Sequence, residues 1–215
     1  MQLWLLAGVL ILNVLISIWN CYAVGSAWKD VNALGGWFEK LLLWCGVVQS
    51  GVGFSMPILL GLTWAAVYFM TTGHPPMLSA AEASELVQGM LSLWYVAVIF
   101  PVLGSGFVIW GYSVREAYRR RDFSSFAIAG WNSYAQIHNT VSAVNHLGGA
   151  FGDVGKLFSS ALGGRGDAKA KLAIIAILLV VLSLVAGFMI AFGLVRYFAN
   201  KTESRIEQYG ETVRA

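Results

Sequence analysis

The chain has 215 residues, of which 58% are hydrophobic and only 12% are charged. Soluble globular proteins carry about a quarter of their residues as charged side chains, so this composition excludes an ordinary soluble domain. The net charge of +3 is too small to indicate a nucleic-acid-binding surface. We therefore expect a protein that is embedded in a lipid bilayer.

Four apolar stretches are each long enough to cross about 30 Å of hydrocarbon as a helix that rises 1.5 Å per residue. They cover residues 3–24, 41–70, 87–113 and 172–195. The first lacks the basic n-region of a secretory signal peptide, and the second contains Pro57 but suits one bent helix better than two spans. The sequence predicts an all-α integral membrane protein with four transmembrane helices.

The domain organisation follows from these spans. Residues 1–199 are predicted to form one polytopic membrane domain, and residues 200–215 a short polar C-terminal tail. The tail carries both signs of charge, so it suits an extension of the last helix into water.

Basic residues predict the orientation, because Lys and Arg are retained on the cytoplasmic side of a membrane. With four crossings, ten of the 14 basic residues lie between the first and second spans or between the third and fourth. We expect that side to be cytoplasmic and both termini to lie outside, in a multi-pass protein of a cell membrane such as a bacterial inner membrane. The predicted cytoplasmic anchors directly follow the third span and are Arg115, Arg119, Arg120 and Arg121.

The segment at about 124–160 has the pattern of an amphipathic helix, placed in the cytoplasm by the four-span topology. Apolar and small residues at alternating spacings of three and four define one narrow seam; the candidate interaction residues on it are Tyr134, Ile137, Val141, Val144, Gly148 and Phe151. Neutral polar side chains lie away from this seam or along its border, and these candidate polar-face or pore-lining residues are Asn132, His138, Asn139, Asn145 and His146.

Three interpretations of this segment stay open. A helix lying flat on the headgroups should have Lys or Arg beside its apolar face, yet residues 123–152 contain no ionisable side chain apart from tyrosine and histidine. A helix that packs its seam against another helix fits the small residues and the spacing better. A polar helix that crosses the membrane beside a water-filled cavity would make five crossings and move the tail to the cytoplasm.

Residues 148–167 add glycines to this segment. Gly148 and Gly152 have the small-xxx-small spacing that allows close helix contact, but the stretch also suits a flexible linker.

No pattern for chemistry is found. His138 and His146 are eight residues apart, about 12 Å along a helix, so they cannot share a metal ion. The four spans lack ionisable residues in their centres, which disfavours an ion-coupled transporter. Cys21 and Cys45 lie in apolar runs and are interpreted as small hydrophobic residues. We expect no enzyme activity, no cofactor and no bound metal.

The sequence thus predicts a non-catalytic structural subunit of a multi-subunit membrane complex, for example a secretion, conjugation or energy-transducing assembly, that acts through helix–helix contacts. Its expected partners are the lipid bilayer and further copies of itself or other membrane subunits, without nucleic acid. An oligomeric channel or holin-like pore with a largely neutral, polar lining is the alternative. A small membrane enzyme whose site is completed by a partner is a third interpretation.

Overall fold

The chain folds into long helices in a computed structural model that describes residues 2–72, 79–162 and 168–214. These helices are α1 (Gln2–Leu34), α2 (Trp37–Thr72), α3 (Ala80–Arg120), α4 (Phe123–Leu162) and α5 (Ala168–Arg214). The segments Ala7–Leu34, Trp37–Thr72, Ala80–Arg120 and Ala170–Thr202 are long and apolar enough to cross a membrane. This confirms the predicted all-α membrane fold, with α4 as a further helix between the third and fourth apolar helices.

Helix α2 packs against α1, α3 and α5 and is antiparallel to each of them. Leu43 and Val47, in its N-terminal part, share an apolar cluster with Cys21 of α1 and with Ala191 and Val195 of α5. Toward the other end of α2, the packing partners come from the beginning of α5, where Ala173 and Ala176 lie beside Leu59. Helices α1 and α5 therefore run in the same direction.

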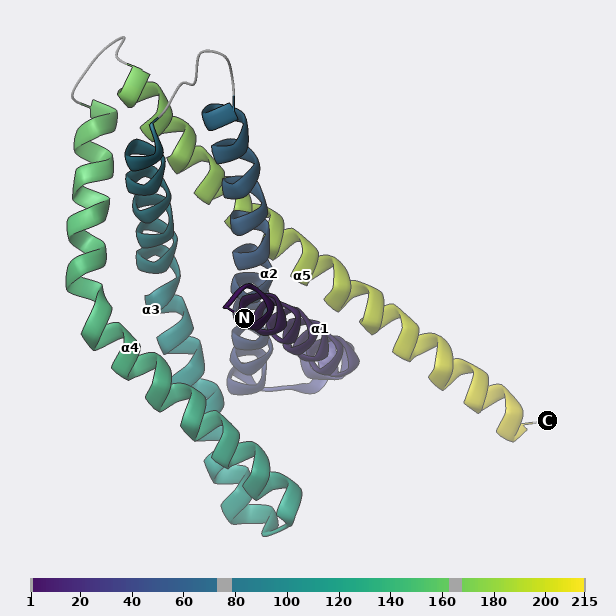
Figure 1. Cartoon of the computed structure of the whole chain (residues 1–215). Helices are drawn as coiled ribbons and strands as arrows, with labels where there is room; N and C mark the ends of the chain where they lie inside the picture. The colour runs from purple at the N-terminus through teal and green to yellow at the C-terminus, as the bar shows by residue number, and fades with distance from the viewer. Residues whose placement is uncertain (1, 73–78, 163–167, 215) are drawn as a thin grey trace.

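The bundle has two ends, which we name by their residues. At the arginine end, α1 and α3 finish while α2 and α4 begin, and the rings of Phe38 and Tyr112 are 6.3 Å apart there. At the pocket end, α2 and α4 finish while α3 and α5 begin, and Ala83 packs against Leu172. Figure 1 shows α3 and α4 side by side between these two ends.

A tight corner joins α3 to α4. Arg121 has a φ of 54° in the left-handed region, which commonly ends a helix, and its backbone N–H donates to the carbonyl of Ala117. The next residue, Asp122, begins α4 by accepting a hydrogen bond of 2.8 Å from the backbone N–H of Ser125. That bond and one from the Ser124 hydroxyl lower the pKa of the Asp122 carboxyl, so the cap is lost only at acidic pH. The chain consequently reverses direction and α4 returns along α3.

Helix α4 continues through glycines that also suited a linker, and α5 has the C-terminal extension that the sequence favoured. Helix α4 continues through Gly148, Gly149 and Gly152 to Leu162, so the expected linker does not begin at Gly148. Helix α5 continues through the predicted polar tail to Arg214, and its C-terminal part extends away from the other helices (Figure 1).

Glycines allow α2 and α5 to approach closely. A Cβ atom at Gly187 would lie 2.7 Å from the backbone nitrogen of Ser55 and would also collide with the carbonyl of Gly51. Those are main-chain atoms of α2, so they cannot move aside without shifting the helix. At Gly193, further along α5, a Cβ atom would meet nothing within 4 Å.

We predict that Gly187→Ala destabilises the protein by about 1–3 kcal/mol, because it overpacks a helix contact. The matched control, Gly193→Ala, should be neutral or slightly stabilising, because alanine is the better helix former. Thermal unfolding of both variants in the same detergent checks this, and equal melting temperatures would contradict the close packing of α2 on α5.

Candidate functional site

Helix α4 packs on α3 through a face that repeats every seven residues. Its buried residues include Ala129, Gln136, Ala143, Ala150 and Leu157. A seven-residue repeat of this kind forms one continuous seam along a helix, and small residues let two membrane helices approach closely. The contact with α3 therefore extends over most of the length of α4.

Polar side chains fix the register of α3 and α4. Trp110 donates from Nε1 to Ser133 Oγ at 2.8 Å near the arginine end, and Gln136 donates from Nε2 to the carbonyl of Leu103 at 3.4 Å. Near the pocket end, Asp153 Oδ2 accepts from Gln88 Nε2 at 3.0 Å and from the Ser92 hydroxyl at 3.2 Å. These bonds hold the two helices antiparallel from one end to the other.

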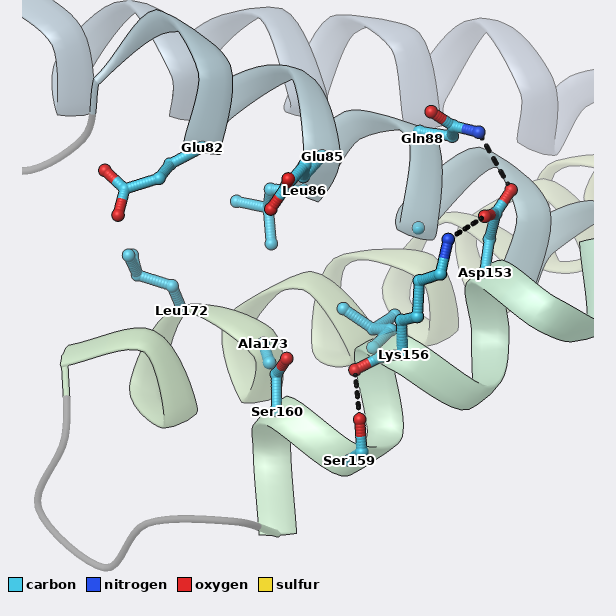
Figure 2. A pocket seen from close by; sticks show the side chains of 12 residues that line it. Glu82, Glu85, Leu86, Gln88, Asp153, Lys156, Ser159, Ser160, Leu172 and Ala173 are labelled. Atoms are coloured by element: carbon cyan, nitrogen blue, oxygen red, sulfur yellow. Dashed lines mark hydrogen bonds and ion pairs between the residues drawn. The ribbon is translucent and has the colours of Figure 1, made fainter.

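A cavity of about 460 Å³ opens at the pocket end, between α3, α4 and the start of α5. We call it the end pocket; it is lined by residues 82, 85, 86, 88 and 89 of α3, 153, 156, 157, 159 and 160 of α4, and 172 and 173 of α5. Figure 2 shows its polar side chains on the facing α3 and α4 ribbons, with Leu172 and Ala173 on the third side. It joins apolar and charged side chains in one lining.

Charged groups of both signs surround the end pocket. Glu82 closes the capping box of α3 with Ser79, while Glu85 is exposed and makes no hydrogen bond or ion pair within the described part of the chain. Lys156 Nζ lies 3.5 Å from Asp153 Oδ1, with its own side chain 83% exposed. The pocket thus combines three carboxylates with one ammonium group.

A second cavity, of about 310 Å³, lies within the bundle between α1, α2, α3 and α4. We call it the inner cavity; its polar lining comes from Asn13, Gln49, Tyr95, Asn139 and Ser142. Gln49 is held by hydrogen bonds to the carbonyl of Val102 and to the Ser105 hydroxyl. The Tyr95 hydroxyl is buried and has no hydrogen-bond partner among the described residues, so the inner cavity is neutral but polar.

The predicted seam lies on the side of α4 that faces away from the bundle. Its large side chains are exposed, by between 50% and 79%; they are Tyr134, Ile137, Val141, Val144 and Phe151. A Cβ atom at Gly148 would likewise meet open space. We call these six residues, with the exposed His138 and Asn145, the outer face of α4.

The predicted polar residues do not share one surface. Asn139 lines the inner cavity, and Asn132 is half-buried near the α3 contact. His138 is exposed and stacks on Tyr134 at 6.1 Å between ring centroids. His146 instead lines a cavity of about 390 Å³ together with Ser92 and Tyr95 of α3. Asn139 and His146, seven residues apart, therefore line cavities beside α3, whereas His138 and Asn145 lie on the outer face.

The predicted arginine anchors lie together at the arginine end. Arg119 and Arg120 both pair with Glu116, at 3.3 Å and 2.8 Å, and the guanidinium of Arg121 lies over the ring of Tyr118. All four arginines, Arg115 included, are exposed.

Sequence reasoning missed the end pocket. Asp153 is far along the chain from Glu82 and Glu85, and only the antiparallel return of α4 brings it beside them. The sequence did contain one indication of the end pocket, because Glu85 and Asp153 each lie at the end of a long interval without charged residues. In the described part of the chain, no group of three or more His, Cys, Asp or Glu side chains is arranged to hold a metal ion.

Comparisons of the chain with protein-family models, with curated proteins and with solved structures find no match. Functional inferences therefore rest on the helix contacts and cavities.

The α3–α4 pairing can be tested with a disulfide. A Cβ atom at Gly89 would lie 3.4 Å from Leu157 Cβ, close to the separation that a disulfide requires. In a background with Cys21 and Cys45 replaced by alanine, we predict that Gly89→Cys with Leu157→Cys forms an intrachain disulfide under mild oxidation. Gly111→Cys with Leu157→Cys should remain reduced, because Gly111 has no neighbour within 4 Å. Equal crosslinking of both pairs, seen by gel shift, would contradict this register.

Proposed function

We propose that the protein is a non-catalytic structural subunit of a multi-subunit membrane complex, in which α4 crosses the membrane beside α3 and offers its outer face to another subunit. The observation that carries this proposal is the unbroken pairing of α4 with an apolar helix. This pairing bears on how deep α4 lies in the membrane. That depth in turn determines which partner suits the chemistry of its outer face.

The depth of α4 follows from its pairing with α3. From Ser133 to Asp153 the helix rises about 30 Å at 1.5 Å per residue, which equals the thickness of the hydrocarbon core. The partners of these two residues, Trp110 and Ser92, lie within an apolar candidate span. If α3 crosses the membrane, this part of α4 crosses with it.

The positions of the charged residues in α3 and α4 support the same depth for α4. In α3 no charged side chain occurs between Glu85 and Arg115, and in α4 none occurs between Asp122 and Asp153. Glu85 and Asp153 both line the end pocket, so the two uncharged intervals are in register. Charged groups are costly in hydrocarbon, which explains why both helices lack them over the same depth.

Five crossings change the predicted orientation. Both termini were expected outside because four crossings were assumed; with α4 inserted, the termini lie on opposite sides. By sequence position, ten of the 14 basic residues then belong to the arginine end and four to the pocket end. The arginine end is therefore the cytoplasmic side, the N-terminus is outside and the C-terminus is in the cytoplasm.

The outer face of α4 is unusual for a surface that contacts lipid. His138 and Asn145 are exposed on it, at levels that lie within the membrane if α4 crosses beside α3. Polar side chains at this depth are stabilised by hydrogen bonds to another protein helix. Open space at Gly148, Gly149 and Gly152 allows such a helix to approach closely. We infer that the occupant is a transmembrane helix of a neighbouring subunit.

Cysteine labelling tests the five-crossing topology. In the background without native cysteines, single cysteines are placed at Ala81, Ser124 and Thr212 and exposed to a membrane-impermeant maleimide in intact cells. We predict that only Ala81→Cys is labelled before lysis, and that Ser124→Cys and Thr212→Cys react only after the membrane is opened. Labelling of Thr212→Cys together with Ala81→Cys in intact cells would contradict the crossing of α4.

Partner contact is tested with a pair of bulky substitutions. Val144, on the outer face of α4, is 79% exposed, and Met189, on α5, is 70% exposed. We predict that Val144→Trp lowers the recovery of co-purifying subunits in mild detergent several-fold, because it overfills a helix contact, whereas Met189→Trp leaves it unchanged. Native mass spectrometry identifies whether the neighbour is another protein or a second copy. A wild-type protein that is monomeric and alone in mild detergent would contradict the proposal.

A channel or holin-like pore is the second candidate function, and the inner cavity favours it. Five neutral polar side chains from four helices gather there, including the predicted lining residue Asn139. Such a lining would conduct with weak ion selectivity. Current through planar bilayers containing the purified chain, lowered by Asn139→Leu, would support the pore over the structural subunit.

A further inference from the structure

With α3, α4 and α5 across the membrane as proposed above, the end pocket lies where the membrane interior meets the headgroups. Glu85, Asp153 and Lys171 are the charged residues that border the uncharged intervals of α3, α4 and α5 at this end. Two of these residues line the pocket, and the third directly precedes Leu172, which also lines it. A molecule bound there is therefore presented to lipid chains on one side and to water on the other.

The lining of the end pocket is amphiphilic. Leu86, Gly89, Leu157, Leu172 and Ala173 provide apolar surface, and all but Leu86 are buried. Three carboxylates, an ammonium group, the Gln88 amide and two serine hydroxyls form the remaining lining (Figure 2). Binding sites that combine apolar surface with a few placed polar groups are typical of small amphiphilic ligands.

The charged groups differ in how free they are to bind a ligand. Glu82 accepts hydrogen bonds from the backbone N–H and hydroxyl of Ser79, and Asp153 is already bonded to Gln88 and Ser92. Glu85 has no such bond within the described residues and points from α3 toward the helices opposite in Figure 2. Lys156 is largely exposed and only loosely paired. The pocket thus offers one free carboxylate and one nearby cation.

We propose that the end pocket binds the headgroup of a zwitterionic phospholipid with a primary ammonium, namely phosphatidylethanolamine. The ammonium group donates to Glu85, with the Asp153 carboxylate nearby, and the phosphate lies beside Lys156 and the hydroxyl of Ser160. The acyl chains follow the apolar side of the pocket.

Other headgroups fit this pocket less well. An anionic headgroup such as phosphatidylglycerol would bring negative charge beside three carboxylates. A choline headgroup has no N–H to donate, and its recognition usually depends on aromatic rings. None of the 12 residues that line the pocket is aromatic.

Native mass spectrometry of the purified full chain tests this site. The protein is incubated with phosphatidylethanolamine, phosphatidylcholine or phosphatidylglycerol of matched acyl chains. We expect preferential retention of phosphatidylethanolamine, reduced about tenfold by Glu85→Gln because a charge-assisted hydrogen bond is lost. Glu116→Gln, which removes a carboxylate at the arginine end, should retain the lipid as the wild type does.

The lipid experiment has outcomes that would overturn the proposed site. Equal retention of the three lipids by the wild type, or unchanged retention by Glu85→Gln, overturns it. If Glu85→Gln does not fold, Lys156→Gln serves instead, because it should weaken retention by removing the partner of the phosphate. Water-soluble glycerophosphoethanolamine should fail to displace the lipid; displacement at equal concentration would identify a soluble ligand and overturn the lipid assignment.

Discussion

The antiparallel packing of α4 on α3 determines the rest of the architecture. It places the beginning of α5 at the pocket end, makes α1 and α5 run in the same direction, and sets Asp153 opposite Gln88 and Ser92. Both ends of the contact are secured by hydrogen bonds to side chains, at Ser133 and at Asp153. A helix held in this way cannot lie flat on a membrane while its partner crosses it.

The four apolar helices could be predicted from the sequence because hydrocarbon requires long uncharged segments, and such segments are visible in the sequence itself. The partner of α4 could not be predicted in this way. Periodicity identified the apolar seam at Tyr134, Ile137 and Val144, but those side chains are exposed. The buried face uses small or polar residues such as Ala129, Gln136 and Ala143.

A physical reason explains this reversal. In water, the apolar face of a helix is the buried one, because burial removes it from solvent. In a bilayer, lipid is as apolar as leucine, so helices associate through close packing of small residues and through hydrogen bonds. Asn139, seven residues after Asn132, lines the inner cavity beside α3, and reading that period as the inward face would have required knowing that α4 pairs with α3.

The two cavities follow from the same helix pair but differ in chemistry. The inner cavity is lined by neutral groups from four helices, and its polarity is compatible with either a packed subunit or a pore. The end pocket gathers charges that border separate uncharged intervals, so it exists only because those intervals are in register. Lipid recognition at that level would anchor the position of the bundle in the membrane, while the outer face of α4 stays available to a neighbouring subunit.

A spin label at Val141 measures how deep α4 lies in the membrane. Val141 is 53% exposed and lies near the middle of the uncharged interval of α4. With the full chain in lipid nanodiscs, the account predicts low collision rates with a water-soluble nickel chelate, well below those of a label at Ser124. A nickel collision rate at Val141 as high as at Ser124 would place α4 in water or at the membrane surface and would contradict the account.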